Sequence, residues 1–238
     1  MIELDRNGSR VAFSTREGGV SEGPYESLNL GILTDDAPAR VTRNREILAG
    51  GIGLDPFRMA MGWQVHGAEI AGWDAPPPPG QEGYAQPGAE LAKVDGHVTG
   101  CQDLGLLVLA ADCLPVALAG PGRVAMLHCG WRGVAAGILR RGVEAFAQPP
   151  AAAIGPGIGR CCFEVGEEVL EQFADVDGAA DGRMLDLRAV AEARLRAAGV
   201  ETVEHVDLCT SCRSDLFFSH RRDGPVTGRQ GGVVWRPT

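Results

Sequence analysis

The 238-residue sequence has no excess of positive charge and no long hydrophobic run. Its formal net charge of -9 disfavours a protein that wraps nucleic acid or docks on an anionic membrane, because both need a basic surface. No apolar run approaches the length that crosses a bilayer, and the N-terminal residues lack the hydrophobic region of a signal peptide. We therefore expect a cytoplasmic protein with small-molecule partners and with neither a nucleic-acid nor a membrane partner.

Histidine is also scarce, and the cysteines do not follow the pattern of a secreted protein. Five histidines are too few for the clusters of a multicopper oxidase. The seven cysteines are an odd number and include the adjacent Cys161 and Cys162, so we expect reduced thiols and no disulfide framework. Cys209 and Cys212 have C-x-x-C spacing, but a zinc site of this type would need a second such pair. We interpret these thiols as structural or incidental.

Hydrophobic residues make up 45% of the sequence, which is enough to form a sizeable buried core. Expected helices and strands alternate along the chain, which predicts a mixed α and β fold. Helices are expected over 38–49, after Gly133 to about Phe146, over 164–173 and from Asp186 to Gly199. Strands are expected over 11–15, 59–65, 106–110, 115–119, 124–129, 151–154 and 202–206.

Two surface features accompany these elements. Asp36 is expected to cap the first helix, whose three arginines (Arg40, Arg43 and Arg45) are most simply interpreted as a solvated face. The Pro- and Gly-rich stretch 73–89 predicts an exposed loop, and the turn residues at 94–96 predict a second loop.

Two candidate site residues, Cys113 and His128, lie in or next to a predicted β-hairpin. Its strands, 115–119 and 124–129, flank a Gly-Pro-Gly turn at 120–122. If the first two residues of this turn form the loop, Cys113 lies directly opposite His128, with Cβ atoms about 5 Å apart. A three-residue loop would leave only a diagonal contact.

His66, in the sequence QVHG, follows an expected strand and is a third candidate. An isolated histidine is most simply structural, so the interpretation depends on partners. If His66 converges with Cys113 and His128, two imidazoles and one thiolate suit Zn²⁺ and leave a fourth position open, as in catalytic zinc sites. Without a metal, Cys113 and His128 would serve as nucleophile and base of a hydrolase. Spacing alone leaves both alternatives open, together with a non-catalytic zinc-stabilised binding protein.

Several segments, spread over nearly the whole chain, carry a family resemblance. They are TREGGVSEGPYESLNLG, QVHG, VDGHVTG, ADCLPV, LHCGWRG, AAIGPGIGRCCFEVG, and FFSHRRDG with GRQGG. Together they resemble the YfiH or laccase-domain family, once called polyphenol oxidases and now regarded as zinc-dependent purine nucleoside phosphorylases. The resemblance implies one domain over residues 1–238, a layered α/β/β/α sandwich, and a monomer or small homo-oligomer.

The same resemblance implies the site and the reaction. It carries the metal ligands over to His66, Cys113 and His128, with zinc expected in preference to copper. It implies phosphorolysis of adenosine, inosine, guanosine and methylthioadenosine to the free base and the (methylthio)ribose 1-phosphate, with adenosine deamination as a side activity. Relatives linked to peptidoglycan editing leave a Cys-His amidase acting on a wall precursor as the first alternative. A copper-dependent polyphenol oxidase is the second.

Phosphorolysis needs an anion pocket, and the sequence offers candidates for it. Arg132 lies near the N-terminus of an expected helix, where the dipole and unpaired N–H groups favour an anion. We expect Arg16 and Arg132 to contact phosphate and Asn29 to contact substrate, with Cys113, His128 and Arg132 as the catalytic set. The arginines at 221, 222 and 229 are secondary candidates, more economically interpreted as a solvated stripe.

Two positions depart from the family pattern. Cys129 stands where a smaller residue is usual before GWRG, and His220 replaces a common tyrosine. Because successive side chains of a strand alternate, Cys129 should point away from His128 and be buried.

Overall fold

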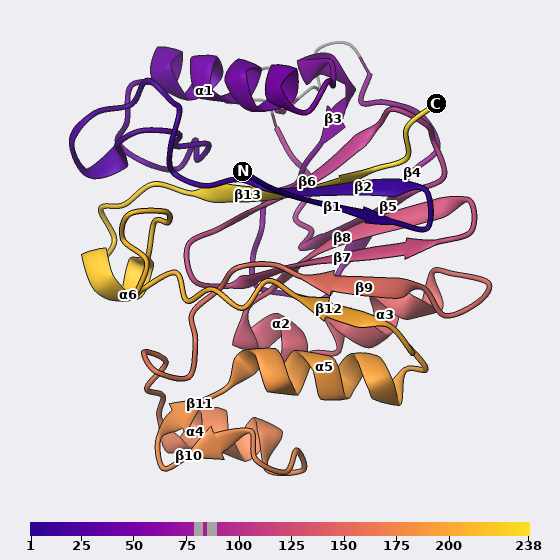
Figure 1. The fold of residues 1–238 in the computed structure, drawn as a ribbon, viewed down its shortest axis with the longest axis vertical. Helices are drawn as coiled ribbons and strands as arrows, with labels where there is room; N and C mark the ends of the chain where they lie inside the picture. Colours follow the sequence, from indigo (N-terminus) through magenta and orange to yellow (C-terminus); the bar gives the residue numbers. More distant parts are fainter. Residues whose placement is uncertain (79–82, 85–89) are drawn as a thin grey trace.

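Two mixed β-sheets pack face to face, and helices cover their outer faces (Figure 1). The computed structural model describes residues 1–78, 83–84 and 90–238. The layers therefore follow the order helix, sheet, sheet, helix, and the predicted mixed α and β sandwich is confirmed. Across the described residues, none of the helices combines the length and apolar composition that crossing a membrane requires.

Each sheet takes its strands from distant parts of the chain. In the first sheet the order is β1 (Ile2–Arg6), β2 (Ser9–Phe13), β13 (Gln230–Trp235), β6 (Gly105–Ala110) and β3 (Met59–Ala60). In the second it is β12 (Val203–His205), β9 (Ala151–Ile154), β7 (Leu114–Gly120), β8 (Arg123–Cys129), β5 (Gly96–Thr99) and β4 (Ile70–Trp73). β10 (Ala180–Asp181) pairs only with β11 (Met184–Leu185) among the described strands.

The helices divide between the two outer faces. α1 (Pro38–Gly51) packs on the first sheet, and α3 (Ile138–Glu144) and α5 (Leu187–Ala197) pack on the second (Figure 1). Short helices occupy the connections: α2 (Trp131–Ala135), α4 (Glu167–Leu170), α6 (His220–Asp223) and the 3-10 turns η1 (Gly23–Tyr25), η2 (Pro56–Arg58) and η3 (Glu171–Phe173).

The core follows the alternation of strand side chains. Leu106 and Val108 of β6 point between the sheets, where they join Ala117 and Met126 of the second sheet. Leu107, between them in sequence, joins the cluster formed with α1. β6 is thus buried on both faces, which explains its unbroken apolar run.

The predicted hairpin is present, but its register differs from the prediction. The loop is Pro121 and Gly122, so Gly120 pairs with Arg123 and Pro115 pairs with His128. Proline fixes the first loop position and Gly122 takes a φ of +74° at the second, as a type II turn requires. The pairing of Cys113 directly opposite His128 is therefore wrong. A shift of two residues preserves the face of the strand, so Cys113 approaches His128 diagonally.

The interpretation of the first helix is wrong in two respects. Asp36 is not its cap; the carboxylate accepts hydrogen bonds from Ser21 and Asn29, and Ala37 precedes the helix. Arg45 is not solvated, since only 1% of it is exposed. Its guanidinium donates to the main-chain oxygens of Leu30, Gly83 and Tyr84.

Other expected elements differ in extent. The helix expected after GWRG is two helices, α2 and α3, separated by Gly137 at φ +87°. The strand expected over 59–65 contains two residues, and residues 94–96 lead directly into β5. The predicted Asp186 cap of α5 is confirmed by its bond from the Ala189 N–H. Residues 79–82 and 85–89 of the expected 73–89 loop lie outside the described residues, while Tyr84 is buried, contrary to an exposed loop.

Three connections between the two sheets bring residues to one cavity. They are the β3–β4, β6–β7 and β12–β13 connections, which contribute His66, Cys113 and Arg229 respectively. The end of β8 adds His128. The topology therefore places the candidate site where the chain repeatedly passes from one sheet to the other.

Candidate metal centre

His66, Cys113 and His128 converge as predicted. Their ligand atoms all lie within 4.8 Å of one another, and the two imidazole rings meet edge to face with centroids 4.9 Å apart. Zinc bonds of about 2.0–2.3 Å to nitrogen and sulfur would bring such atoms to between 3 and 4 Å, roughly, around one ion. The donor set of two imidazoles and one thiolate therefore fits a single zinc ion and leaves one coordination position for another ligand.

Asp95, a residue that the sequence analysis did not identify, bonds to the side chain of His128 and to the main chain of His66. Its carboxylate is fully buried and lies 2.8 Å from Nδ1 of His128. The same carboxylate accepts hydrogen bonds from the main-chain N–H groups of Val65, His66 and Gly67. Because Asp95 engages Nδ1, the Nε2 atom of His128 is left to face Cys113 and a metal, the arrangement in which carboxylates orient metal-binding histidines.

The loop that carries His66 is fixed at two further points. Gln64 exchanges two hydrogen bonds with the main chain of Leu109, which ties the loop to β6. His66 itself has a φ of +61°, a left-handed conformation that aims its ring toward the other two candidates. Gly130 makes room for this approach, since a Cβ there would lie 3.0 Å from both Cys113 Sγ and His66 Cδ2. The first glycine of the GWRG motif therefore leaves the space that the Cys113 and His66 side chains occupy.

Asp112 shapes the turn that presents Cys113. Its φ is +95°, and its carboxylate accepts hydrogen bonds from the Thr210 hydroxyl at 2.7 Å and the Arg221 main-chain N–H at 2.7 Å. The Asp112 carbonyl also accepts from the Ile158 N–H. These bonds attach the Cys113 turn to segments that follow β9 and β12.

Cys113, His128 and Asp95 stabilise one another's charged forms. Burial opposes ionisation of Cys113, but His128 and His66 outweigh it and lower the pKa of the thiol to about 6. Burial likewise opposes protonation of His128, but Cys113 and Asp95 raise its pKa to about 9. Burial opposes the charge on Asp95, yet hydrogen bonds from His128, Gly67 and Val65 lower its pKa. Without a metal the site thus favours a thiolate beside an imidazolium.

The centre opens into a cavity of about 420 Å³. The size is within the range of pockets that hold small organic ligands, roughly 300–1,000 Å³. Apolar and aromatic residues make up most of the wall, including Trp63 and Phe163. The cationic or titratable lining residues beyond the metal candidates are Asp112, His220, Arg221 and Arg229.

The predicted substrate contacts do not line this cavity. Arg132 is exposed and stacks on Trp131, with its guanidinium carbon 4.3 Å from the ring centroid. Arg16 donates to the carbonyl oxygens of Glu26 and Ser214 and lies over the Phe218 ring. None of the three predicted contacts, Asn29 included, is among the described lining residues.

Asn29 instead forms hydrogen bonds to residues of the cavity wall without lining the cavity itself. Its side chain is fully buried, and its oxygen accepts from the N–H groups of Gly31 and Arg229. Its amide donates to Thr34 and Asp36. Asn29 therefore positions Gly31, Thr34 and Arg229, which do line the cavity.

Arg229 is the cation that the cavity holds most deeply. Burial lowers its pKa, while the nearby Cys113 and Asp112 oppose that effect. Nη1 donates to the carbonyl oxygens of Thr227 and Gly228, which fixes the guanidinium. Arg221 is more exposed, lies over the Phe163 ring and donates to the Cys162 carbonyl. Arg222 does not reach the cavity and bonds to Asp223 and to nearby carbonyl oxygens.

Cys129 is buried, as expected. It is 0% exposed and joins the apolar cluster on the outer face of the second sheet, opposite His128 on β8. Burial raises the pKa of its thiol well above the ordinary value, so the thiolate form is disfavoured.

Comparisons with known proteins identify the family. The profile of a family described as "Multi-copper polyphenol oxidoreductase laccase" matches residues 10–237. A purine nucleoside phosphorylase of Streptomyces coelicolor is 40% identical over 243 aligned positions, covering 96% of each chain. The purine nucleoside phosphorylase YfiH of Escherichia coli is 38% identical over 243 positions, covering 96% of this chain and 94% of the relative.

Solved structures agree with these relatives. YlmD from Geobacillus stearothermophilus matches with a TM-score of 0.89 at 33% identity, covering 98% of this chain and 93% of that one. The Bacillus licheniformis hypothetical protein YfiH matches with a TM-score of 0.88 at 31% identity, covering 96% of this chain and 93% of that one. The chain therefore belongs to the laccase-domain (YfiH) family, as its motifs predict.

Proposed function

We propose that this protein is a zinc-dependent purine nucleoside phosphorylase. One observation carries the proposal: a His-Cys-His centre and two arginines line the same cavity, and the size of that cavity suits a nucleoside. The names of the relatives, purine nucleoside phosphorylases over nearly their whole length, support the same reaction class. The proposed substrates are adenosine, inosine, guanosine and methylthioadenosine with phosphate, and adenosine deamination is a proposed side activity.

His66, Cys113 and His128 would hold the zinc ion. When bound, the ion supplies a Lewis acid for an oxygen of phosphate or substrate. A thiolate among three protein ligands suits zinc, whereas the histidine-rich clusters of multicopper enzymes have no counterpart in this centre. Asp95 keeps the His128 ring in one orientation and in one tautomer, with the proton on Nδ1.

Arg229, Arg221 and His220 would form the phosphate site. A guanidinium presents several donors in a fixed plane and matches the geometry of a phosphate oxyanion. Arg229 is already immobilised by its two carbonyl contacts, so little side-chain freedom is lost when an anion binds. We assign the anion to this group in place of Arg16 and Arg132, because those two side chains lie outside the cavity lining.

Trp63 and Phe163 would contact the purine. Both line the cavity and offer flat apolar surfaces on which a planar base stacks. Aromatic stacking accepts adenine, hypoxanthine and guanine alike, which fits a broad range of purine nucleosides.

The proposal is tested by measuring purine release from adenosine and inosine, with and without phosphate, by protein of known zinc content. We expect release to require phosphate and to yield ribose 1-phosphate in equal amount, and His66→Ala to abolish it. Free ribose as the product, formed at the same rate without phosphate, would sink the phosphorylase assignment.

A metal-free Cys-His hydrolase is the second candidate. Asp95, His128 and Cys113 form a buried chain in which the carboxylate orients the imidazole and the imidazole faces the thiol. Cys113 would thus be the nucleophile, His128 the base and Asp95 the acid that orients the base. Such an enzyme would remain active on an amide of a wall precursor after chelation and would lose activity on thiol alkylation, whereas the phosphorylase loses activity on chelation.

A further inference from the structure

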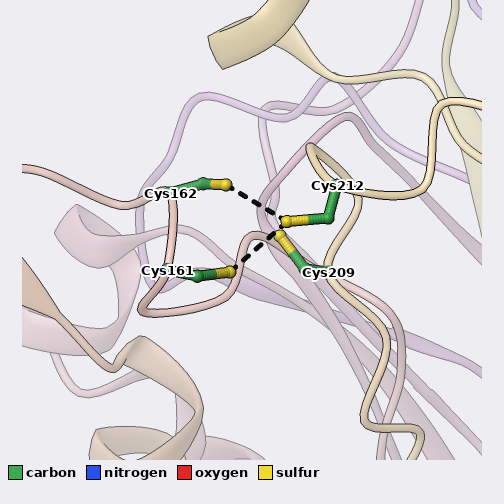
Figure 2. Close-up of side chains that lie close together, drawn as sticks. All are labelled: Cys161, Cys162, Cys209 and Cys212. Carbon is green, nitrogen blue, oxygen red and sulfur yellow. Dashed lines mark hydrogen bonds between the residues drawn. The ribbon is translucent and has the colours of Figure 1, made fainter.

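Four cysteines outside the cavity lining bring their sulfur atoms together. The Sγ atoms of Cys161, Cys162, Cys209 and Cys212 all lie within 4.8 Å of one another and point toward a common centre (Figure 2). Cys212 Sγ lies 3.5 Å from the sulfur of Cys161 and 3.4 Å from that of Cys162. No pair is joined by a disulfide among the described cysteines.

The sequence did not connect these residues because the two pairs are unlike. Cys209 and Cys212 have C-x-x-C spacing, whereas their partners are adjacent in the chain. The first pair follows β9 and the second follows β12, and β9 and β12 are neighbouring parallel strands. Segments that leave the same ends of two parallel strands lie side by side, so the topology supplies the second pair that C-x-x-C spacing alone lacks.

The spacing of the sulfurs fits one tetrahedral ion. Zinc–sulfur bonds of about 2.3 Å place the four ligands of a regular tetrahedron about 3.8 Å apart. The observed sulfur separations, 3.4 Å for Cys162 and Cys212, 3.5 Å for Cys161 and Cys212, and at most 4.8 Å for the other pairs, lie close to that spacing. An iron–sulfur cluster would need wider spacing, because several iron and sulfide atoms lie between its cysteines.

The surroundings favour a thiolate at Cys209. The Gly159 N–H donates to Cys209 Sγ at 3.2 Å, a bond that stabilises a negatively charged sulfur. The Arg213 N–H donates to the Cys209 carbonyl and closes the C-x-x-C turn. Two of the four side chains are exposed, so a metal could enter from solvent without unfolding.

We propose that Cys161, Cys162, Cys209 and Cys212 form a second, structural zinc site with four thiolate ligands. Binding displaces the thiol protons and uses all four sulfurs, so no open position remains and the site is not catalytic. The proposal is independent of the phosphorylase assignment, since it concerns other metal ligands and requires no particular reaction in the cavity.

The site would brace the wall of the cavity. Arg221 donates to the Cys162 carbonyl, and Thr210, between the two C-x-x-C cysteines, donates to Asp112. Both Arg221 and Asp112 line the cavity, and Asp112 precedes Cys113. An ion held by the two cysteine segments would therefore restrict the movement of Arg221 and Asp112 in the cavity wall.

The test counts zinc in a His66→Ala/Cys113→Ser variant, which lacks two of the three candidate ligands of the cavity. Protein is purified anaerobically with a thiol reductant and analysed by elemental mass spectrometry and zinc X-ray absorption. We expect about one zinc per chain with about four sulfur neighbours at about 2.3 Å. The matched controls are Cys209→Ser/Cys212→Ser, which should lose one zinc relative to the unsubstituted protein, and Cys101→Ser, which should lose none.

A zinc-free His66→Ala/Cys113→Ser variant whose four thiols titrate as free groups would overturn the proposal. So would a disulfide among these cysteines after anaerobic purification, or iron in place of zinc. If that variant does not fold, the unsubstituted protein decides: two sites predict about 2.5 sulfurs per zinc, the mean of four and one, and a cavity site alone predicts about one.

A structural readout separates the site from adventitious metal. In Cys209→Ser/Cys212→Ser, we expect faster amide hydrogen exchange in residues 159–163 as well, although that segment carries no substitution. Unchanged exchange there would overturn the bracing role.

Discussion

The Asp95 carboxylate lies 2.8 Å from Nδ1 of His128 and also accepts the main-chain N–H of His66 at 2.9 Å. One buried acid thus sets the positions of two candidate metal ligands from different segments of the chain. The centre depends on this relationship as much as on the ligands themselves, since a histidine ring free to rotate would bind a metal less tightly.

Replacing Asp95 tests that dependence. Asp95→Asn keeps the size of the side chain but weakens its bonds to His128 and to the His66 loop, so we expect zinc affinity to fall about 10–100-fold. Competition with a chromophoric chelator measures the affinity of the cavity site. Asp177→Asn, at an exposed position, is the control and should leave the affinity unchanged. Equal affinities in the two variants would contradict the role given to Asp95.

The phosphate site is tested by comparing two arginines. Arg229→Gln removes the cation fixed inside the cavity, and we expect the KM for phosphate to rise about tenfold or more, since hydrogen bonds to charged groups contribute about 1.5–3 kcal/mol. Arg132→Ala should leave that KM unchanged, because the Arg132 side chain stacks on Trp131. Initial rates at varied phosphate measure both. A higher KM in Arg132→Ala alone would restore the assignment made from the sequence.

The pH dependence of thiol alkylation reports the charge state of Cys113. In the metal-free protein its pKa of about 6 lies below the ordinary value of 9.0, so the thiolate should predominate at pH 7. Alkylation of Cys113, followed by peptide mass spectrometry, should therefore show a midpoint near pH 6. Asp95→Asn should move that midpoint upward, because a less basic His128 carries less positive charge. Zinc should protect the thiol, and a midpoint near pH 9 in the metal-free protein would contradict the account.

The buried Arg45 makes a prediction about stability. Arg45→Ala leaves the carbonyl oxygens of Leu30, Gly83 and Tyr84 without their donor, and we expect the free energy of unfolding to fall by about 2–4 kcal/mol. Arg43→Ala, two residues away on the opposite, exposed face of α1, should cost less than about 0.5 kcal/mol, since its surface pair with Glu46 is screened by solvent. Urea denaturation measures both. Similar losses would mean that the Arg45 contacts contribute little.

The sequence predicted the layers and the convergence of His66, Cys113 and His128, but not the residues that position them. Apolar runs identified most of the central strands, and the hairpin led to Cys113 and His128 even though its register was wrong, because a two-residue shift keeps the same face. Asp95 was missed because an Asp-Gly pair is typical of turns, and only long-range contacts show that its carboxylate is buried.

Arg45 left a signal that was not used. It follows Val41 by four residues and precedes Leu48 by three, so it shares their buried face of α1. The sequence offered Arg229 only as a secondary candidate beside Arg221 and Arg222, and it gave no signal that joins the two pairs of cysteines. Their partners lie in distant segments, and only the sheet order brings those segments together.

The most direct test of the central claim is a zinc titration of the metal-free protein with phosphate-dependent purine release as the readout. We predict no release before zinc is added, an increase that follows occupancy of the His66, Cys113 and His128 centre, and no increase in His66→Ala. Full release by the metal-free protein, or equal activation of His66→Ala, would contradict the account.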